Sequence, residues 1–232
     1  MQRFPWFSRR PAQCGISLRR LVVITTVVLL LVLASPALAH HAMGGVTPQT
    51  SWQGFLSGLA HPLIGIDHAA GIVAVGLLAA TQPKGMVLPL GFALTALVGT
   101  GLHLAGVSLP GVELAIAASL VLVGVGLGLG DGHPRLLWGG LATLVGLGHG
   151  YAYGEAIVGA EPQALGAYLI GFTLTQACIG LMAFSLGRIT LPQPALTPLP
   201  LRLRIAGGVL GGIGLSLLYS QLVQLVLPVM PS

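Results

Sequence analysis

Residues 61–76 read HPLIGIDHAAGIVAVG, which places two histidines and an aspartate in a segment apolar enough to cross a bilayer. An ionisable side chain near the centre of a membrane helix costs about 2.5–3.5 kcal/mol or more on insertion scales. His61, Asp67 and His68 therefore need polar partners. The remaining ionisable residues on apolar segments are candidates for the same site: His103, Glu113, His149 and Glu155.

The composition of the whole chain is that of a membrane protein. Of its 232 residues, 54% are hydrophobic and 6% are charged, whereas soluble domains carry about 25% charged residues. The formal net charge of +5 could indicate an anionic partner, but five of the ten Lys and Arg residues precede residue 21. The positive charge is therefore mostly a targeting feature, and we expect no nucleic-acid partner.

Residues 1–39 have the three parts of a secretory signal peptide: a basic start, the apolar run LVVITTVVLLLVLA, and an Ala-x-Ala end. We predict cleavage after Ala39, which leaves 40–232 as the mature transmembrane domain; the alternative is an uncleaved first transmembrane helix. Cleavage would expose an amine followed by His40 and His41, a nitrogen donor set suited to nickel or copper. The alternative for these two histidines is a simple polar start to the mature chain.

Six apolar segments follow, each at or above the about 20 residues that a bilayer core requires. We place them at 53–80, 86–106, 110–130, 135–158, 163–187 and 205–227. The prediction is an all-α membrane protein with six transmembrane helices after a cleavable signal peptide. If the mature amino terminus lies outside, the inner loops contain every Lys and Arg of the mature chain, as cytoplasmic loops commonly do. These loops are 82–85, 131–135 and 188–204.

The polar residues on these segments fall at similar depths when each residue is given a helical rise of about 1.5 Å. His61 lies in the outer half of its helix, and Asp67 and His68 lie near the middle. The outer halves of the other helices hold His103, Glu113, His149 and Glu155. His61 and His68 are seven residues apart and share one face if the helix between them is unbroken, although Pro62 marks a start or kink near His61.

Imidazole and carboxylate groups together suit divalent ions such as nickel, cobalt, zinc, copper or iron. Asp67 and Glu155 point elsewhere on their helices and would orient a histidine. The pattern favours a metal or proton pathway at this depth; the alternative is that each histidine hydrogen-bonds across a helix interface. The sequence contains no nucleotide-binding motif, so active transport would need the membrane potential, a proton gradient or a partner protein.

The stretch at 61–76, the segment HGYAYGEA at 149–156 and six helices behind a signal peptide resemble the HupE/UreJ family over essentially the whole mature chain. His61-Pro62, Gly65 and Asp67-His68 stand where the family has them. The resemblance implies a nickel or cobalt permease that supplies a cytoplasmic enzyme such as hydrogenase or urease. We expect it in the bacterial inner membrane, and the loop charges favour a mature N-terminus outside. The ligands that it implies are His61, Asp67, His68, His149 and Glu155.

One departure from the family pattern concerns the second motif, which begins His-Gly-x-Ala-His. This chain has Tyr153 where the family has the second histidine, one helical turn after His149. A phenol stays protonated at neutral pH and is a poorer nickel ligand than imidazole. The substitution implies fewer nitrogen ligands, a different preferred metal, or a histidine that is not essential.

These observations predict a secondary or facilitated transporter of divalent transition-metal ions, with nickel preferred and cobalt next. The expected partners are the metal ion and the lipid bilayer; a homo-oligomer and nickel-enzyme assembly proteins are further partners that we consider. We expect no resident cofactor and no catalytic residue. Two alternatives are an intramembrane metal-dependent hydrolase, although His-Glu-x-x-His is absent, and a structural membrane partner of a metalloenzyme.

Overall fold

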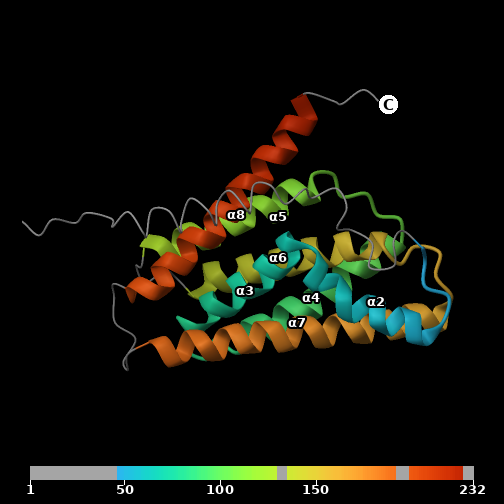
Figure 1. Ribbon diagram of the computed structural model, residues 1–232, viewed down its shortest axis with the longest axis horizontal. Helices are drawn as coiled ribbons and strands as arrows, with labels where there is room; N and C mark the ends of the chain where they lie inside the picture. Colours follow the sequence, from blue (N-terminus) through green and yellow to red (C-terminus); the bar gives the residue numbers. More distant parts are fainter. Residues whose placement is uncertain (1–45, 130–134, 192–198, 227–232) are drawn as a thin grey trace, which may run out of the picture. The chain divides into compact units, whose positions relative to one another are not determined.

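A computed structural model describes residues 46–129, 135–191 and 199–226. All of them belong to one compact unit, Ser35–Ser232. The predicted signal peptide, His40 and His41 lie outside the described residues. All the regular secondary structure that is described is helical (Figure 1). The helices are α2 (Ser51–Ile64), α3 (Ile66–Ala80), α4 (Val87–Leu104), α5 (Val112–Leu129), α6 (Arg135–Glu155), α7 (Pro162–Thr190) and α8 (Leu201–Val226).

The first apolar segment is a broken helix. It begins at a capping box, in which the Thr50 hydroxyl accepts the Gln53 backbone N–H at 3.2 Å and the Gln53 side chain accepts the Thr50 N–H at 3.2 Å. Pro62 lies inside α2, so the kink that we expected near His61 comes later, at Gly65, where α2 and α3 meet at 76°.

The side chains that follow Gly65 explain the position of the break. A Cβ at Gly65 would lie 2.6 Å from the His68 ring and 2.7 Å from Asp67 Oδ1, so a glycine leaves the room that both need. Asp67 Oδ1 also accepts the His68 backbone N–H at 2.8 Å, which satisfies a donor in the first turn of α3. The break therefore places Asp67 and His68 at the start of a helix inside the bundle.

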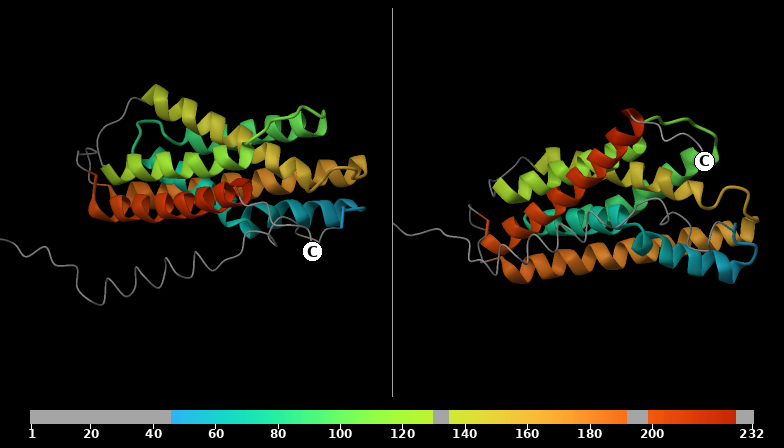
Figure 2. Two further views of the ribbon diagram at one scale, coloured as in Figure 1. Left: turned by 90° about the horizontal axis from the view of Figure 1, so that it is seen from above. Right: turned by 45° about the horizontal axis from the view of Figure 1, so that its top comes forward.

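Small residues and interhelical hydrogen bonds join the helices. α5 and α8 lie side by side in every view (Figure 2), and a Cβ at Gly124 of α5 would overlap the backbone of Gly211 of α8. α4 and α6 are paired in the same way, since a Cβ at Gly150 would overlap the Ala96 carbonyl. The Thr100 hydroxyl then donates to the Gly150 carbonyl across this interface at 2.7 Å. Such close backbone contact is typical of membrane helices.

Four described helices are long and apolar enough to cross a membrane, namely α4, α5, α7 and α8. The bent pair α2–α3 makes five if it forms one span. α6 is 21 residues long but does not belong to this apolar group. Several apolar helices with outward leucine and valine side chains make this a multi-pass membrane protein, while the predicted count of six spans stays a prediction.

The two ends of the helix bundle carry opposite charges. Three described acidic side chains lie at one end, which we call the acidic end: Glu113 in the first turn of α5, Glu155 at the end of α6 and Glu161 before α7. The basic side chains that the structure describes belong to the opposite, basic end: Lys84, Arg188, Arg202 and Arg204. Arg204 Nε donates to the Gly128 carbonyl at 2.8 Å and so caps α5 there.

Candidate metal pathway

Two histidines meet at the break between α2 and α3. His61 and His68 are 4% and 1% exposed, and their ring centroids are 5.6 Å apart. The structure thus brings together the pair that the sequence placed seven residues apart on one helical face. Both rings belong to the segment 61–76 that the sequence singled out, and both lie inside the bundle.

The hydrogen bonds of Tyr168 on α7 fix the tautomer of His61. The Tyr168 hydroxyl donates to the Tyr153 carbonyl at 2.9 Å, because a carbonyl can only accept. With its one hydrogen used, this hydroxyl accepts from His61 Nδ1 at 3.1 Å. Nδ1 of His61 therefore carries a hydrogen, so a metal ion that bound this ring would have to use Nε2.

His149 on α6 is oriented by the same logic. Its Nδ1 lies 2.9 Å from the Val145 carbonyl, so Nδ1 carries the hydrogen and Nε2 the lone pair. Nε2 is buried and has no hydrogen-bond partner in the described part of the chain. A Cβ at Gly71 of α3 would overlap Nε2, and the ring centroid lies 5.3 Å from that of His68. The lone pair of His149 therefore faces α3, one turn beyond His68.

Tyr153 completes this group of rings. It is fully buried, its centroid lies 4.5 Å from His68 and 5.0 Å from His61, and its hydroxyl has no hydrogen-bond partner among the residues described. The Asp67 carboxylate interacts electrostatically with both His149 and Tyr153. We call His61, His68, His149 and Tyr153 the histidine cluster.

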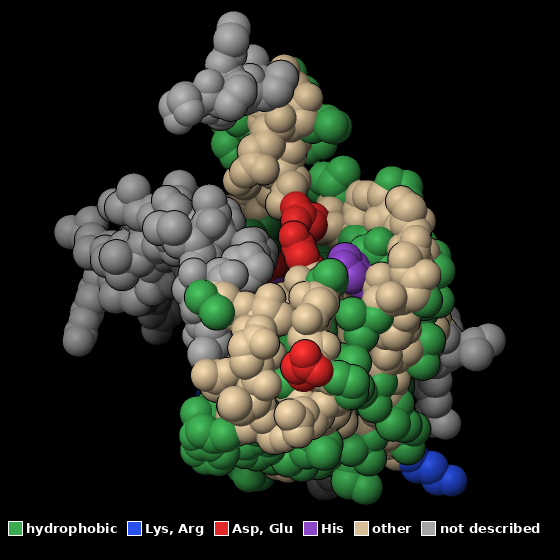
Figure 3. Space-filling view, turned by 90° about the vertical axis from the view of Figure 1, so that its right-hand side faces the viewer, with side chains coloured by type: hydrophobic (Ala, Val, Ile, Leu, Met, Phe, Trp, Pro, Cys, Tyr) green, Lys and Arg blue, Asp and Glu red, His purple; other side chains and the backbone are tan. Residues whose placement is uncertain are grey.

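Two adjoining cavities connect the acidic end with this cluster. An outer cavity of about 450 Å³ opens at the acidic end, where Figure 3 shows acidic side chains at a hollow with a histidine beside them. An inner cavity of about 20 Å³ is lined by His61, Asp67 and His68. Glu113 and Glu155 line both cavities, so the two carboxylates stand where the cavities meet.

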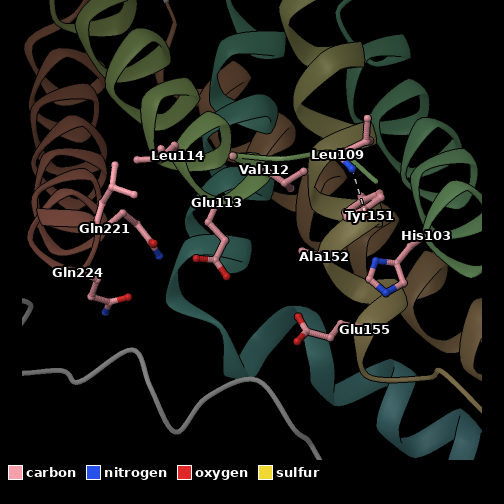
Figure 4. A pocket seen from close by; sticks show the side chains of 12 residues that line it. His103, Leu109, Val112, Glu113, Leu114, Tyr151, Ala152, Glu155, Gln221 and Gln224 are labelled. Carbon is pink, nitrogen blue, oxygen red and sulfur yellow. Dashed lines mark hydrogen bonds between the residues drawn. The ribbon is translucent and has the colours of Figure 1, made fainter. Parts of the chain in front are cut away.

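The outer cavity has a polar wall on each side (Figure 4). Tyr151 fastens the loop after α4, because its hydroxyl donates to the Val107 carbonyl at 2.8 Å and accepts the Leu109 N–H at 3.2 Å. The His103 ring packs edge-on against Tyr151 at 4.6 Å. His103 therefore lines the outer cavity rather than the histidine cluster. Gln221 and Gln224 of α8 line the opposite side.

The ligand candidates are spread along this route. Within the described residues, no group of three or more His, Cys, Asp or Glu side chains is placed to hold one metal ion. The structure instead presents the carboxylate pair, then His61 with Asp67 and His68, then His149. The predicted site residues thus occupy successive positions rather than one centre.

Sequence reasoning missed two buried residues on α7, Tyr168 and Gln176. It looked for ionisable side chains, and neither residue is charged at neutral pH. Their signal was available as two large side chains with hydrogen-bonding groups eight residues apart in a mostly apolar segment. Spacing of eight residues places them on one helical face.

These features define a multi-pass helical membrane protein with a buried histidine cluster beneath an acidic cavity. The chain belongs to the HupE / UreJ protein family, which matches residues 28–217, so the family resemblance is confirmed. Protein HupE of Rhizobium leguminosarum bv. viciae is 29% identical over 188 residues, which cover 80% of this chain and 93% of that protein. No solved structure matches the chain.

Proposed function

We propose that this protein is a secondary transporter or facilitated-diffusion permease for divalent transition-metal ions. Nickel is the preferred ion and cobalt its competitor, and the cargo supplies a cytoplasmic metalloenzyme such as hydrogenase or urease. One observation carries the proposal: an acidic outer cavity adjoins an inner cavity lined by His61, Asp67 and His68. Membership of the HupE / UreJ family supports it.

Capture of a cation follows from the charges around the cavities. Three of the five acidic residues in the chain line them, namely Asp67, Glu113 and Glu155, and neither lining includes a Lys or Arg. A concave surface with one sign of charge raises the local concentration of the opposite ion. The volume of about 450 Å³ admits a hydrated divalent ion to the carboxylate pair.

Dehydration follows from the inner cavity. Its volume of about 20 Å³ is close to the space that one water needs. An ion that enters must therefore exchange most of its water for protein ligands, and the histidine nitrogens with Asp67 suit nickel and cobalt. Because the ligands are spread out, each position would hold the ion weakly enough to release it to the next.

The broken helix supports a transport role. Secondary transporters commonly place substrate and ion sites at interrupted membrane helices. The break at Gly65 lies beside His61 and His68, so a change of the 76° bend would change the distance between two ligands. A resident zinc hydrolase would instead require three protein ligands on one ion, and no such group occurs within the described ranges.

The topology that we propose has six spans, with the pair α2–α3 as the first and α6 as the fourth. α6 is less apolar because it carries His149, Tyr151 and Tyr153 toward the cavities and cluster, where lipid does not reach. We propose that the signal peptide is cleaved after Ala39 and that the acidic end faces outward. The basic end would then lie in the cytoplasm, in agreement with the positive-inside rule.

The test is uptake of radioactive nickel by cells that express the full chain. We expect Asp67→Asn and His68→Ala to reduce uptake at least tenfold at equal membrane abundance. Glu161→Gln is the matched control, because Glu161 is exposed and lines neither cavity. Uptake that the two variants leave intact would remove Asp67 and His68 from the pathway, and an intact chain without nickel or cobalt uptake would refute the function.

A further inference from the structure

Gln176 on α7 is a buried polar residue that the pathway described so far does not use. Its side chain is 0% exposed, and neither the amide oxygen nor the amide nitrogen has a hydrogen-bond partner among the described residues. Buried amides are almost always paired, because an unpaired one destabilises the fold. A buried amide with no partner in the described part of the bundle therefore calls for a function.

The position of Gln176 follows from its neighbours on α7. Phe172, Gln176 and Gly180 recur every four residues and so share a helical face. The Phe172 ring lies 5.4 Å from the Tyr153 ring, at the level of the histidine cluster. A Cβ at Gly180 would lie 3.6 Å from Ile72, which follows His68 by one turn of α3. Gln176 therefore lies between these levels, just past the cluster toward the basic end.

This position extends the route that begins at the carboxylate pair. His149 Nε2 faces α3 at the next turn after His68, and it has no hydrogen-bond partner among the residues that the structure describes. The Gln176 oxygen has two lone pairs and is equally unpartnered in the described part of the chain. Two buried acceptors at consecutive levels can both be satisfied by a cation that passes between them.

We propose that Gln176 is a ligand for the divalent cation in transit, and that its amide oxygen receives the ion from His68 and His149. This inference rests on the proposed transport function. A neutral amide oxygen replaces one lost water without adding a charge that would trap the ion. Gln176 therefore binds the ion during its movement toward the basic end, after Glu113 and Glu155 have captured it.

A packing role and a ligand role for Gln176 predict different results when the residue is substituted. Phe172 and Gly180, one turn to either side of Gln176 on the same face of α7, adjoin the Tyr153 ring and Ile72, so an apolar residue of similar length suits this position and leaves no unpaired group. Removal of a buried unpaired amide should stabilise the protein, while removal of an ion ligand should slow transport. An ion ligand therefore predicts higher stability together with slower transport, a combination that a purely structural residue does not produce.

The experiment uses the full chain in liposomes, with nickel uptake and thermal unfolding measured on the same preparations. Gln176→Met should lower the maximal uptake rate about tenfold without raising KM, because the outer carboxylates are intact. It should also raise Tm by about 2–4 °C. Gln163→Met is the matched control, since Gln163 is exposed in the first turn of α7 and lines neither cavity; it should change neither quantity.

Gln176→Glu provides a second variant that tests the same point through charge. A carboxylate at this position should bind the ion more tightly, so both KM and the maximal rate should fall. Unchanged nickel transport by both variants would overturn the inference, as would a fall in transport that accompanies a fall in Tm. If the intact chain transports neither nickel nor cobalt, the proposed function fails and the inference fails with it.

Discussion

The hydroxyl of Tyr168 offers a test of how the histidine cluster is oriented, because Tyr168→Phe removes one oxygen and no candidate ligand. That oxygen makes two hydrogen bonds, to His61 Nδ1 at 3.1 Å and to the Tyr153 carbonyl at 2.9 Å. Tyr168 and Tyr153 are 0% exposed and His61 is 4% exposed, so the two groups left behind are largely shielded from solvent. Unpaired buried groups cost about 1–3 kcal/mol, and a chain of this size should lose about 2–4 °C of Tm per kcal/mol.

The larger effect should fall on metal affinity. Tyr168 holds the hydrogen of His61 on Nδ1 and so fixes both the tautomer and the orientation of the ring. Removal of a group that orients a ligating histidine typically lowers metal affinity about 10–100-fold. We therefore expect the KM for nickel uptake to rise by at least tenfold in Tyr168→Phe.

The assay is nickel uptake by the full chain in liposomes over a range of nickel concentrations, together with thermal unfolding. Tyr219→Phe is the matched control, because Tyr219 is 71% exposed on α8 and should change neither KM nor Tm. A Tyr168→Phe protein with an unchanged KM would refute the reasoning, since it would show that nickel does not depend on the orientation of His61.

Three further predictions concern the same route. Gly65→Ala should raise the nickel KM about tenfold, because a Cβ there would displace Asp67 and His68; Gly91→Ala, whose Cβ would meet nothing within 4 Å, should leave uptake unchanged. Tyr153→His should lower the nickel KM and the maximal rate, because imidazole adds a nitrogen ligand, and equal values in a concentration series would contradict this. Uptake should fall as pH drops below about 6, since protons compete with the metal for imidazole, and a flat profile from pH 7.5 to 5.5 would argue against histidine ligation.

The helices were the most predictable feature of this protein. The expected segment 110–130 is α5, Val112–Leu129, and the expected segment 163–187 is α7, Pro162–Thr190. Long apolar runs bounded by proline, glycine and charge define such helices, because the bilayer sets their length and the breakers set their ends. The contact between α2 and α7, which brings Tyr168 to His61, was not predictable, because helix order in a bundle depends on tertiary packing.

The sequence also predicted the depth of each histidine in the membrane, but it did not predict which of them lie close together. The helical rise places His61, His68 and His149 in neighbouring layers, and the structure has them together. The same reasoning placed His103 with them, whereas the ring lies in the wall of the outer cavity beside Tyr151. Two residues at one depth can face different sides of their helices, and only the packed bundle decides which sides meet.

The break at Gly65 shows why shared helical faces were not enough to make the histidine pair. In an unbroken helix, residues seven apart are separated by about 10.5 Å along the axis, too far for both imidazoles to hold one ion. The 76° bend between α2 and α3 brings the two side chains closer, so the His61 and His68 ring centroids lie 5.6 Å apart. The pair therefore depends on the bend, and Gly65 permits the bend because it leaves room for Asp67 and His68. A motion that straightens the helix would separate the two ligands, which links release of a bound ion to a change in backbone conformation at one residue.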